Sequence, residues 1–168
     1  GPDLIIKLSS SKLWEDLNIP IVSIGDPKLF IDRAALLKKK IKIIELDSLN
    51  KVSKNSKGLI QIIKVTKCSN TRPGKLYKSN AQYVLDNLTY SIKQTMQNEG
   101  TALVTGPLSK ENIISIDKLF TGHTEYIKKI TKSNDVLMML ASDQLRVALA
   151  TTHIPVSYTH LRAHETLR

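Results

Sequence analysis

Short apolar runs alternate with stretches of helical periodicity through the first part of the chain. Apolar residues at helical spacing predict an amphipathic helix that opens at Pro2 and ends before Pro20, and a second helix over residues 27–40. The runs that predict buried strands are residues 21–26, 41–46 and 59–65. Residues 47–58 are polar and rich in turn-forming residues, which indicates a surface excursion between two strands.

A long amphipathic helix is the clearest element of the second part. Its apolar face runs from Ala81 to Met96, Ser79 is positioned as its N-terminal cap, and Gly100 follows its end. Residues 101–106 then predict a strand. Ser109 is positioned to cap a short helix that reaches Ile114.

The last predicted elements are two strands joined by a tight turn. They cover residues 135–142 and 145–153, with only Asp143 and Gln144 between them, so part of the sheet is expected to be antiparallel. The order of all the elements predicts an α/β fold with a mixed, mostly parallel sheet and helices on both of its faces.

Composition places the chain among soluble, single-domain proteins. Of its 168 residues, 41% are apolar and 24% charged. No apolar run approaches the roughly 20 residues of a membrane span, and the first residues lack the pattern of a signal peptide. Cys68 is the single cysteine, which predicts an inert or buried thiol and no disulfide. The sequence therefore predicts a cytoplasmic protein without a membrane partner.

The net charge of +10 does not by itself indicate a nucleic-acid partner. It comes mostly from scattered lysines, whereas aromatic residues make up only 5% of the chain. The one dense run, Lys38 to Lys40 with Lys42, falls where a helix is predicted to end, and cations there complement the helix dipole. We therefore expect a solvated basic surface and no nucleic acid.

Both ends of the chain depart from the pattern of the rest. It opens with Gly1 rather than Met, and we expect a missing upstream segment. Residues 157–168 hold two of the five arginines, two of the four histidines and no lysine, and they resemble a translated sequencing adapter. We therefore expect a native domain over residues 1–156 and a non-native tail over residues 157–168. His160 and His164 lie in that tail, so we do not consider them metal ligands.

Three stretches combine a strand end or helix start with chemically useful side chains. They are residues 104–113 with Lys110, residues 120–127 with His123 and Thr124, and residues 150–156 with His153. In open α/β sheets, ligands bind beyond the carboxyl ends of the strands, where helix N-termini attract anions. From spacing alone, the same residues also fit a plain turn, a solvated lysine and structural histidines. The sequence contains neither a P-loop nor a G-x-G-x-x-G motif.

These stretches, in this order and spacing, closely resemble the 4-hydroxythreonine-4-phosphate dehydrogenase (PdxA) family of pyridoxal phosphate biosynthesis. The resembling segments read VTGPLSKENI, FTGHTEYI and MMLASDQLRVALATTHIPV. The likeness extends upstream through PGKLYKSNAQYVLDNL and FIDRAALL and covers residues 1–156. Chains of this family are longer, so we expect the sequence to correspond to the N-terminal half.

The resemblance implies a cytoplasmic, homodimeric dehydrogenase with an isocitrate and isopropylmalate dehydrogenase-like fold. Its substrate would be the small phosphorylated amino acid 4-phosphooxy-L-threonine, oxidised with NAD and then decarboxylated. A divalent metal, such as zinc, magnesium or cobalt, would be held by three histidines. Matched motif to motif, His153 falls on the first metal histidine, and His123 and Thr124 fall on the substrate-binding pair.

Two other functions stay open at this point. A related dehydrogenase acting on another phosphorylated hydroxy acid, such as a threonate phosphate, would carry the same motifs. A non-enzymatic basic binding domain is the other alternative, and a nucleic-acid affinity that falls steeply with salt would identify it. Because only one metal histidine is found in a matching motif, we expect the 168-residue chain to be inactive by itself.

Overall fold

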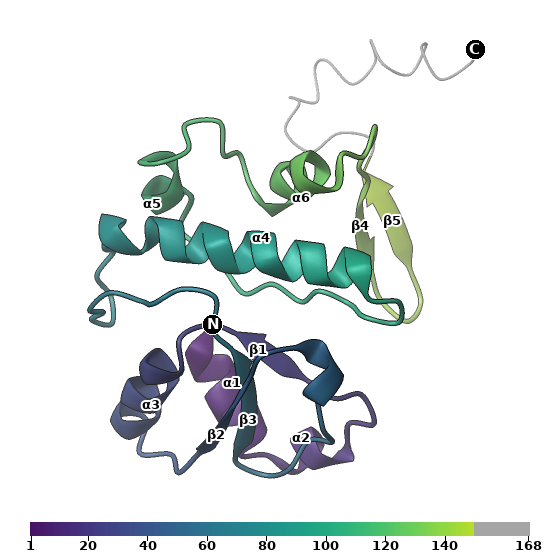
Figure 1. The fold of residues 1–168 in the computed structure, drawn as a ribbon. Helices are drawn as coiled ribbons and strands as arrows, with labels where there is room; N and C mark the ends of the chain where they lie inside the picture. The colour runs from purple at the N-terminus through teal and green to yellow at the C-terminus, as the bar shows by residue number, and fades with distance from the viewer. Residues whose placement is uncertain (150–168) are drawn as a thin grey trace, which may run out of the picture. The chain divides into compact units, whose positions relative to one another are not determined.

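The computed structural model describes residues 1–149, which Figure 1 shows in colour. The chain divides into two compact units between Gly122 and His123. Among the described residues, no helix is both long enough and apolar enough to cross a membrane.

A three-stranded parallel sheet organises the first unit. Its strands are β1 (Val22–Ile24), β2 (Lys42–Leu46) and β3 (Leu59–Ile63), in the order β1-β3-β2. Each lies within a run predicted as a strand, so these three predictions are confirmed. Because β3 is central, four of its five residues are buried.

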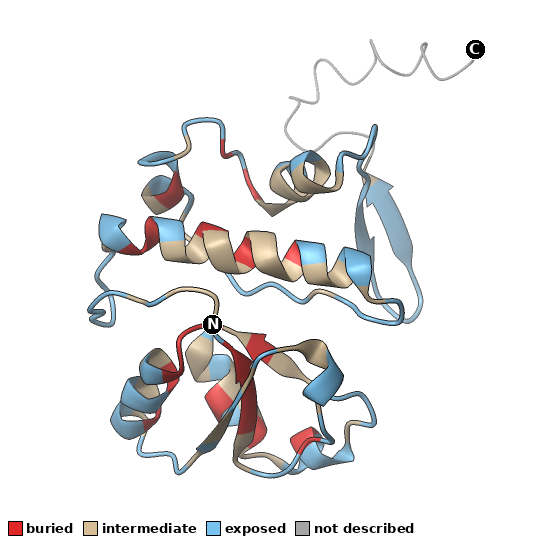
Figure 2. Cartoon of the chain, viewed as in Figure 1, coloured by how far each residue is buried: buried red, intermediate tan, exposed pale blue. Residues whose placement is uncertain are grey.

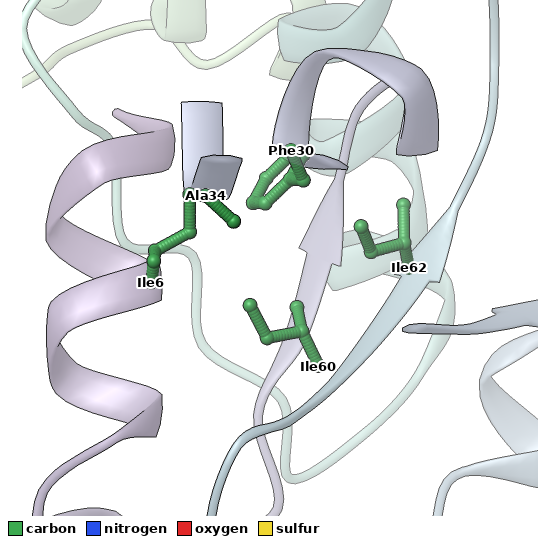
Figure 3. Packing of buried hydrophobic residues seen from close by; sticks show 5 residues of the cluster. All are labelled: Ile6, Phe30, Ala34, Ile60 and Ile62. Carbon is green, nitrogen blue, oxygen red and sulfur yellow. The ribbon is translucent and has the colours of Figure 1, made fainter. Parts of the chain in front are cut away.

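The hydrophobic core lies between β3 and two helices, α1 (Pro2–Ser9) and α3 (Pro27–Leu36). Ile60 and Ile62 point to the same face of β3, since alternate residues of a strand share a face. Figure 3 shows them beside Phe30, Ala34 and Ile6, and Figure 2 shows burial concentrated in the same elements. Each fully buried isoleucine contributes roughly 1.5–3 kcal/mol, so this cluster is a major source of stability.

Residues 47–58 are less superficial than predicted. They include a 3-10 helix, η1 (Leu49–Lys51). Beyond it, Ser53 and Asn55 form hydrogen bonds to neighbouring segments. The amide of the buried Gln61 of β3 accepts from the Ser53 backbone N–H and donates to the Ser53 carbonyl. Asn55, 5% exposed, accepts from the N–H of Ile21 and donates to the carbonyl of Ile19. These bonds attach the excursion to β3 and to the start of β1.

The predicted first helix is in fact two helices. α1 ends at Ser9, and α2 (Lys12–Asp16) follows after a break. The hydroxyls of Ser9 and Ser10 both donate to the Ile6 carbonyl, and the Ser11 hydroxyl donates to the Leu8 carbonyl. Three successive serines thus offer the backbone alternatives to helical bonding, which explains the interruption.

The long predicted helix is confirmed as α4 (Ala81–Gln97), although its start differs in detail. Ser79 does not cap it, because Ser79 lies within a 3-10 turn, η2 (Lys78–Asn80), that runs directly into α4. The face of α4 predicted to be apolar carries the buried residues Ala81, Leu85, Leu88 and Ile92.

The strand predicted over residues 101–106 is wrong. This segment has no regular structure, and Val104 is 92% exposed. A strand requires a neighbour to satisfy its backbone groups, and among residues 1–149 no strand pairs with this segment. Its apolar sequence alone is therefore insufficient to make it a strand.

The second unit contains α6 (His123–Thr131) and a hairpin of β4 (Met138–Ala141) and β5 (Arg146–Leu149). The hairpin is antiparallel, as predicted, and its turn is closed by a bond from the Leu145 N–H to the Ser142 hydroxyl. In the described residues it forms a two-stranded sheet of its own rather than part of one mixed sheet. Figure 2 shows both strands largely exposed.

The end of α3 contains a backbone conformation unusual for its residue. The N–H groups of Lys38 and Lys39 donate to the carbonyls of Ala35 and Ala34, which is the Schellman arrangement. Lys38 therefore has a φ of 53°, where glycine is usually found. A lysine in the left-handed region is strained by about 1 kcal/mol.

We predict that Lys38→Gly raises the free energy of unfolding by roughly 0.5–1 kcal/mol, because glycine adopts this conformation without strain. Urea denaturation followed by circular dichroism measures the change. Lys39→Gly is the control, since it adds backbone freedom without relieving a positive φ, and it should lower stability. Equal loss of stability in both variants would contradict the prediction.

Candidate functional site

The first predicted stretch, residues 104–113, lies in the first unit. A Cβ placed on Gly106 would be 3.5 Å from the Gly1 Cα, so the segment before α5 (Lys110–Ile114) contacts the start of α1. The Ser109 hydroxyl accepts from the Asn112 N–H at 3.3 Å, which confirms Ser109 as the cap of α5. Lys110 is exposed in the first turn of this helix.

The second predicted stretch ends in helix α6, in the second unit. The helix begins at His123, so His123 and Thr124 lie in its first turn, as predicted. Both side chains are half-buried. The backbone N–H groups and the positive dipole end of a helix favour an anion at this position.

The third predicted stretch, with His153, lies outside the described residues, as does the predicted tail with His160 and His164. Within residues 1–149, no three His, Cys, Asp or Glu side chains are grouped so that they could hold a metal ion. The part of the chain that the structure describes therefore does not by itself supply the three-ligand site that the family resemblance implies.

A buried carboxylate at the carboxyl edge of the parallel sheet was not singled out from the sequence. Asp26 follows β1 and is 2% exposed. Its Oδ1 accepts from the Lys28 N–H at 3.1 Å and caps α3, while its Oδ2 accepts from the Cys68 N–H at 2.8 Å. The Lys64 ammonium lies 3.9 Å from Oδ1. We call this arrangement the Asp26 junction; the Asp-Pro pair at a predicted helix start was its only sequence signal.

Tyr83 of α4 extends the Asp26 junction to a third segment. Its hydroxyl accepts from the Asp26 N–H at 3.0 Å. A Cβ on Gly25 would lie 3.0 Å from the same oxygen and 3.1 Å from the Phe30 ring, so a larger residue here would push against both side chains. Burial is the main cause that raises the pKa of Tyr83, which stays protonated at neutral pH.

Cys68 is held between two acceptors rather than exposed for reaction. Its thiol is 3.5 Å from Asn80 Oδ1, which also accepts from the Ser69 N–H at 2.7 Å. Burial, followed by the negative charge of Asp26, raises the pKa of the thiol. The thiol is therefore protonated and a poor nucleophile, in agreement with the inert cysteine predicted from the sequence.

A pocket of about 420 Å³ lies at the ends of β2 and β3, lined by Glu45, Leu46, Asp47, Lys51 and Lys64. Of the predicted site residues that lie within residues 1–149, none lines this pocket. Lys51 pairs with Asp47 at 2.6 Å, and Lys64 faces Asp26, so much of the charge in the pocket is already compensated within the protein.

Comparison with known proteins extends these observations. The sequence profile of the family described as pyridoxal phosphate biosynthetic protein PdxA matches residues 16–164. The 4-hydroxythreonine-4-phosphate dehydrogenase of Citrobacter koseri is 36% identical over 93% of this chain and 46% of its own length. The enzyme of the same name from Pseudoalteromonas translucida is 38% identical over 94% of this chain and 47% of its own. The chain thus spans about half the length of these relatives.

Solved structures of the same enzyme share the fold. The 4-hydroxythreonine-4-phosphate dehydrogenase of Burkholderia phymatum superposes with a TM-score of 0.81 at 23% identity. The enzyme from Klebsiella pneumoniae gives the same TM-score at 24% identity. Each comparison covers 93% of this chain and 47% of the other. The α/β arrangement described above is therefore that of these dehydrogenases.

We predict that Asp26→Ala lowers the free energy of unfolding by roughly 2–3 kcal/mol, because α3 loses its cap and the Cys68 N–H loses its acceptor. Chemical denaturation measures the loss. Asp32→Ala is the matched control: Asp32 is also on α3, but its ion pair with Lys28 is exposed, so the change should stay within about 0.5 kcal/mol. A loss no larger than that of the control would show that the junction is dispensable.

Proposed function

The chain belongs to the family of the pyridoxal phosphate biosynthetic protein PdxA, and on that premise we propose that it takes part in 4-hydroxythreonine-4-phosphate dehydrogenase activity. The proposed substrate is 4-phosphooxy-L-threonine and the proposed oxidant is NAD. The relatives that match at more than 30% identity carry this enzyme name, which supports the proposal.

The proposed reaction has two steps. The carbon bearing the secondary hydroxyl gives a hydride to the nicotinamide ring, and the hydroxyl proton leaves to a base or to water. The product is a β-keto acid, whose carboxylate leaves as carbon dioxide. The electron pair of the broken C–C bond passes to the ketone as an enolate, which then takes up a proton from water or a protein acid. The phosphate of the substrate stays unchanged throughout, so the protein can use it as a binding group.

The start of α6 is the observation that carries this proposal for the described residues. An imidazole and a hydroxyl, from His123 and Thr124, lie in the first turn, where the positive end of the helix dipole attracts an anion. We propose that this pair binds the anionic substrate and orients it. Such binding contributes to rate by fixing the reacting carbon in one position.

We further propose His153 as a metal ligand, on the family resemblance alone. Because residues 1–149 supply no set of three ligands, no step of the reaction is assigned to a metal. A cytoplasmic homodimer is likewise proposed from the resemblance.

We predict that replacing the equivalent of His123 by Ala in the Citrobacter koseri relative weakens transition-state binding by roughly 1.5–3 kcal/mol, because a charge-assisted contact is lost. The value of kcat/KM from NADH absorbance measures this loss. Alanine at the equivalent of Lys132, which directly follows the last residue of α6, is the control and should leave kcat/KM unchanged. An unchanged kcat/KM in the His123 variant would contradict the proposed role in substrate binding and indicate a structural role.

For the purified 168-residue chain we predict no NADH production with 4-phosphooxy-L-threonine and NAD. The family resemblance implies three metal histidines, and the sequence offers one in a matching motif. Zinc titration by calorimetry should accordingly show only weak binding, since a single imidazole holds zinc loosely. The Citrobacter koseri relative, assayed in parallel, is the positive control. Measurable turnover, or tight zinc binding that depends on His153, would contradict this prediction.

A further inference from the structure

The charge of the chain is distributed unevenly around the carboxyl edge of the parallel sheet. Between Asp47 and Asp86 the sequence contains eight Lys or Arg residues and no Asp or Glu. Five of the eight follow β3 directly; they are Lys64, Lys67, Arg72, Lys75 and Lys78. In α/β sheets with parallel strands, this edge is where ligands bind.

Most of these cations lie on a loop whose two ends are fastened together. The Ser69 N–H donates to Asn80 Oδ1 at 2.7 Å, which closes the loop over residues 69–80. The Asp26 junction holds the preceding residue, because the Cys68 N–H donates to Asp26 Oδ2. On the far side, Asn112 of α5 donates to the Tyr77 carbonyl at 3.0 Å. We call residues 69–80 the basic loop; loops with joined ends are often functional.

The tip of the basic loop is a rigid turn with a cation at each end. The Lys75 N–H donates to the Arg72 carbonyl at 3.1 Å, Pro73 occupies the second position, and Gly74 has a φ of 76°. These are the features of a type II β-turn, in which the first and last Cα atoms lie within about 7 Å of each other. Arg72 and Lys75 are therefore held as a pair by the backbone.

The cations of this pair are exposed and available. Arg72 and Lys75 are both exposed, and within residues 1–149 no ion pair involves either of them. Because their Cα atoms are close, both long side chains can reach the same anion, which would then attract two positive charges. A guanidinium also presents a planar fork of donors that matches phosphate oxygens.

We propose that the basic loop binds the phosphate of a small ligand through Arg72 and Lys75. The ligand carries either a phosphomonoester or the pyrophosphate of a dinucleotide. This inference rests on the proposed function, which supplies both kinds of ligand. Within the loop the single aromatic residue is Tyr77, whose backbone is tied to α5, so the loop lacks the stacking platform of a single-stranded nucleic-acid site.

The first test measures binding of two probes to the 168-residue chain by calorimetry at low salt. The probes are O-phospho-L-threonine, which carries a phosphomonoester, and NAD, which carries a pyrophosphate. The double variant Arg72→Gln, Lys75→Gln should weaken binding of at least one probe about three- to tenfold, and the probe affected identifies the phosphate source. The control Lys39→Gln, Lys40→Gln removes the same charge from the end of α3 and should change binding less than twofold.

A second pair of variants separates loop geometry from charge. Gly74→Ala keeps every cation but disfavours the positive φ of the turn, and should weaken binding of the same probe. Gly100→Ala is the matched control, since Gly100 has a φ of 74° and, like Gly74, open space around its Cβ position. It should leave binding unchanged.

Several results would overturn the inference. These are no binding of either probe by the parent chain, equal weakening by the two double variants, and binding of a ten-nucleotide single strand through Arg72 and Lys75 with neither small probe bound. His123→Ala separates this inference from the proposed function. If only His123→Ala weakens binding, the loop proposal fails and the substrate site at α6 stands. If only the loop variants weaken binding of O-phospho-L-threonine, the loop proposal stands and the α6 site fails. If the loop variants weaken only NAD binding and His123→Ala weakens only binding of O-phospho-L-threonine, both proposals stand.

Discussion

The carboxylate of Asp26 is the interaction on which the arrangement of the first unit depends. One oxygen fixes the start of α3 and the other fixes the chain leaving β3, while the adjacent N–H is bound by Tyr83 of α4. A buried carboxylate is costly to desolvate and is retained where several donors compensate it. Because the hydrogen-bond partners of Asp26 come from three segments, displacing any one of them leaves a buried polar group without its partner.

Apolar patterning was sufficient to predict the elements that bury a face against a neighbour. The three parallel strands, α3, α4 and the hairpin were all predicted, since their periodicity reflects their own packing. The failures have different causes. Residues 101–106 have the composition of a strand but no partner in the described residues, and pairing is not encoded within one segment. At Ser9 to Ser11, hydrogen bonds from the hydroxyls to backbone carbonyls compete with the backbone hydrogen bonds of the helix. The hydrophobic pattern contains no information about that competition.

The candidate site shows the same division between local and distant information. His123 and Thr124 at a helix start were predictable because a helix boundary is a local signal. The Asp26 junction and the closure of the basic loop were not, since their bonds join residues far apart in the chain. Asp26 reaches Cys68 across 42 positions and Tyr83 across 57. Only the folded backbone brings these groups together, so spacing within a motif does not reveal them.

The contact between Gly1 and Gly106 has a consequence for biosynthesis of the protein. The core around β3 needs nothing beyond Ile62, so it can form while the rest of the chain is still being made. The contact at Gly106 needs 44 more residues than Ile62, which ribosomes add in roughly 2–9 s at their usual rates. During that interval α1 packs on β3 with its first turn uncovered. Folding of the first unit is therefore sequential in time, with α1 packed on β3 before its contact with Gly106 can form.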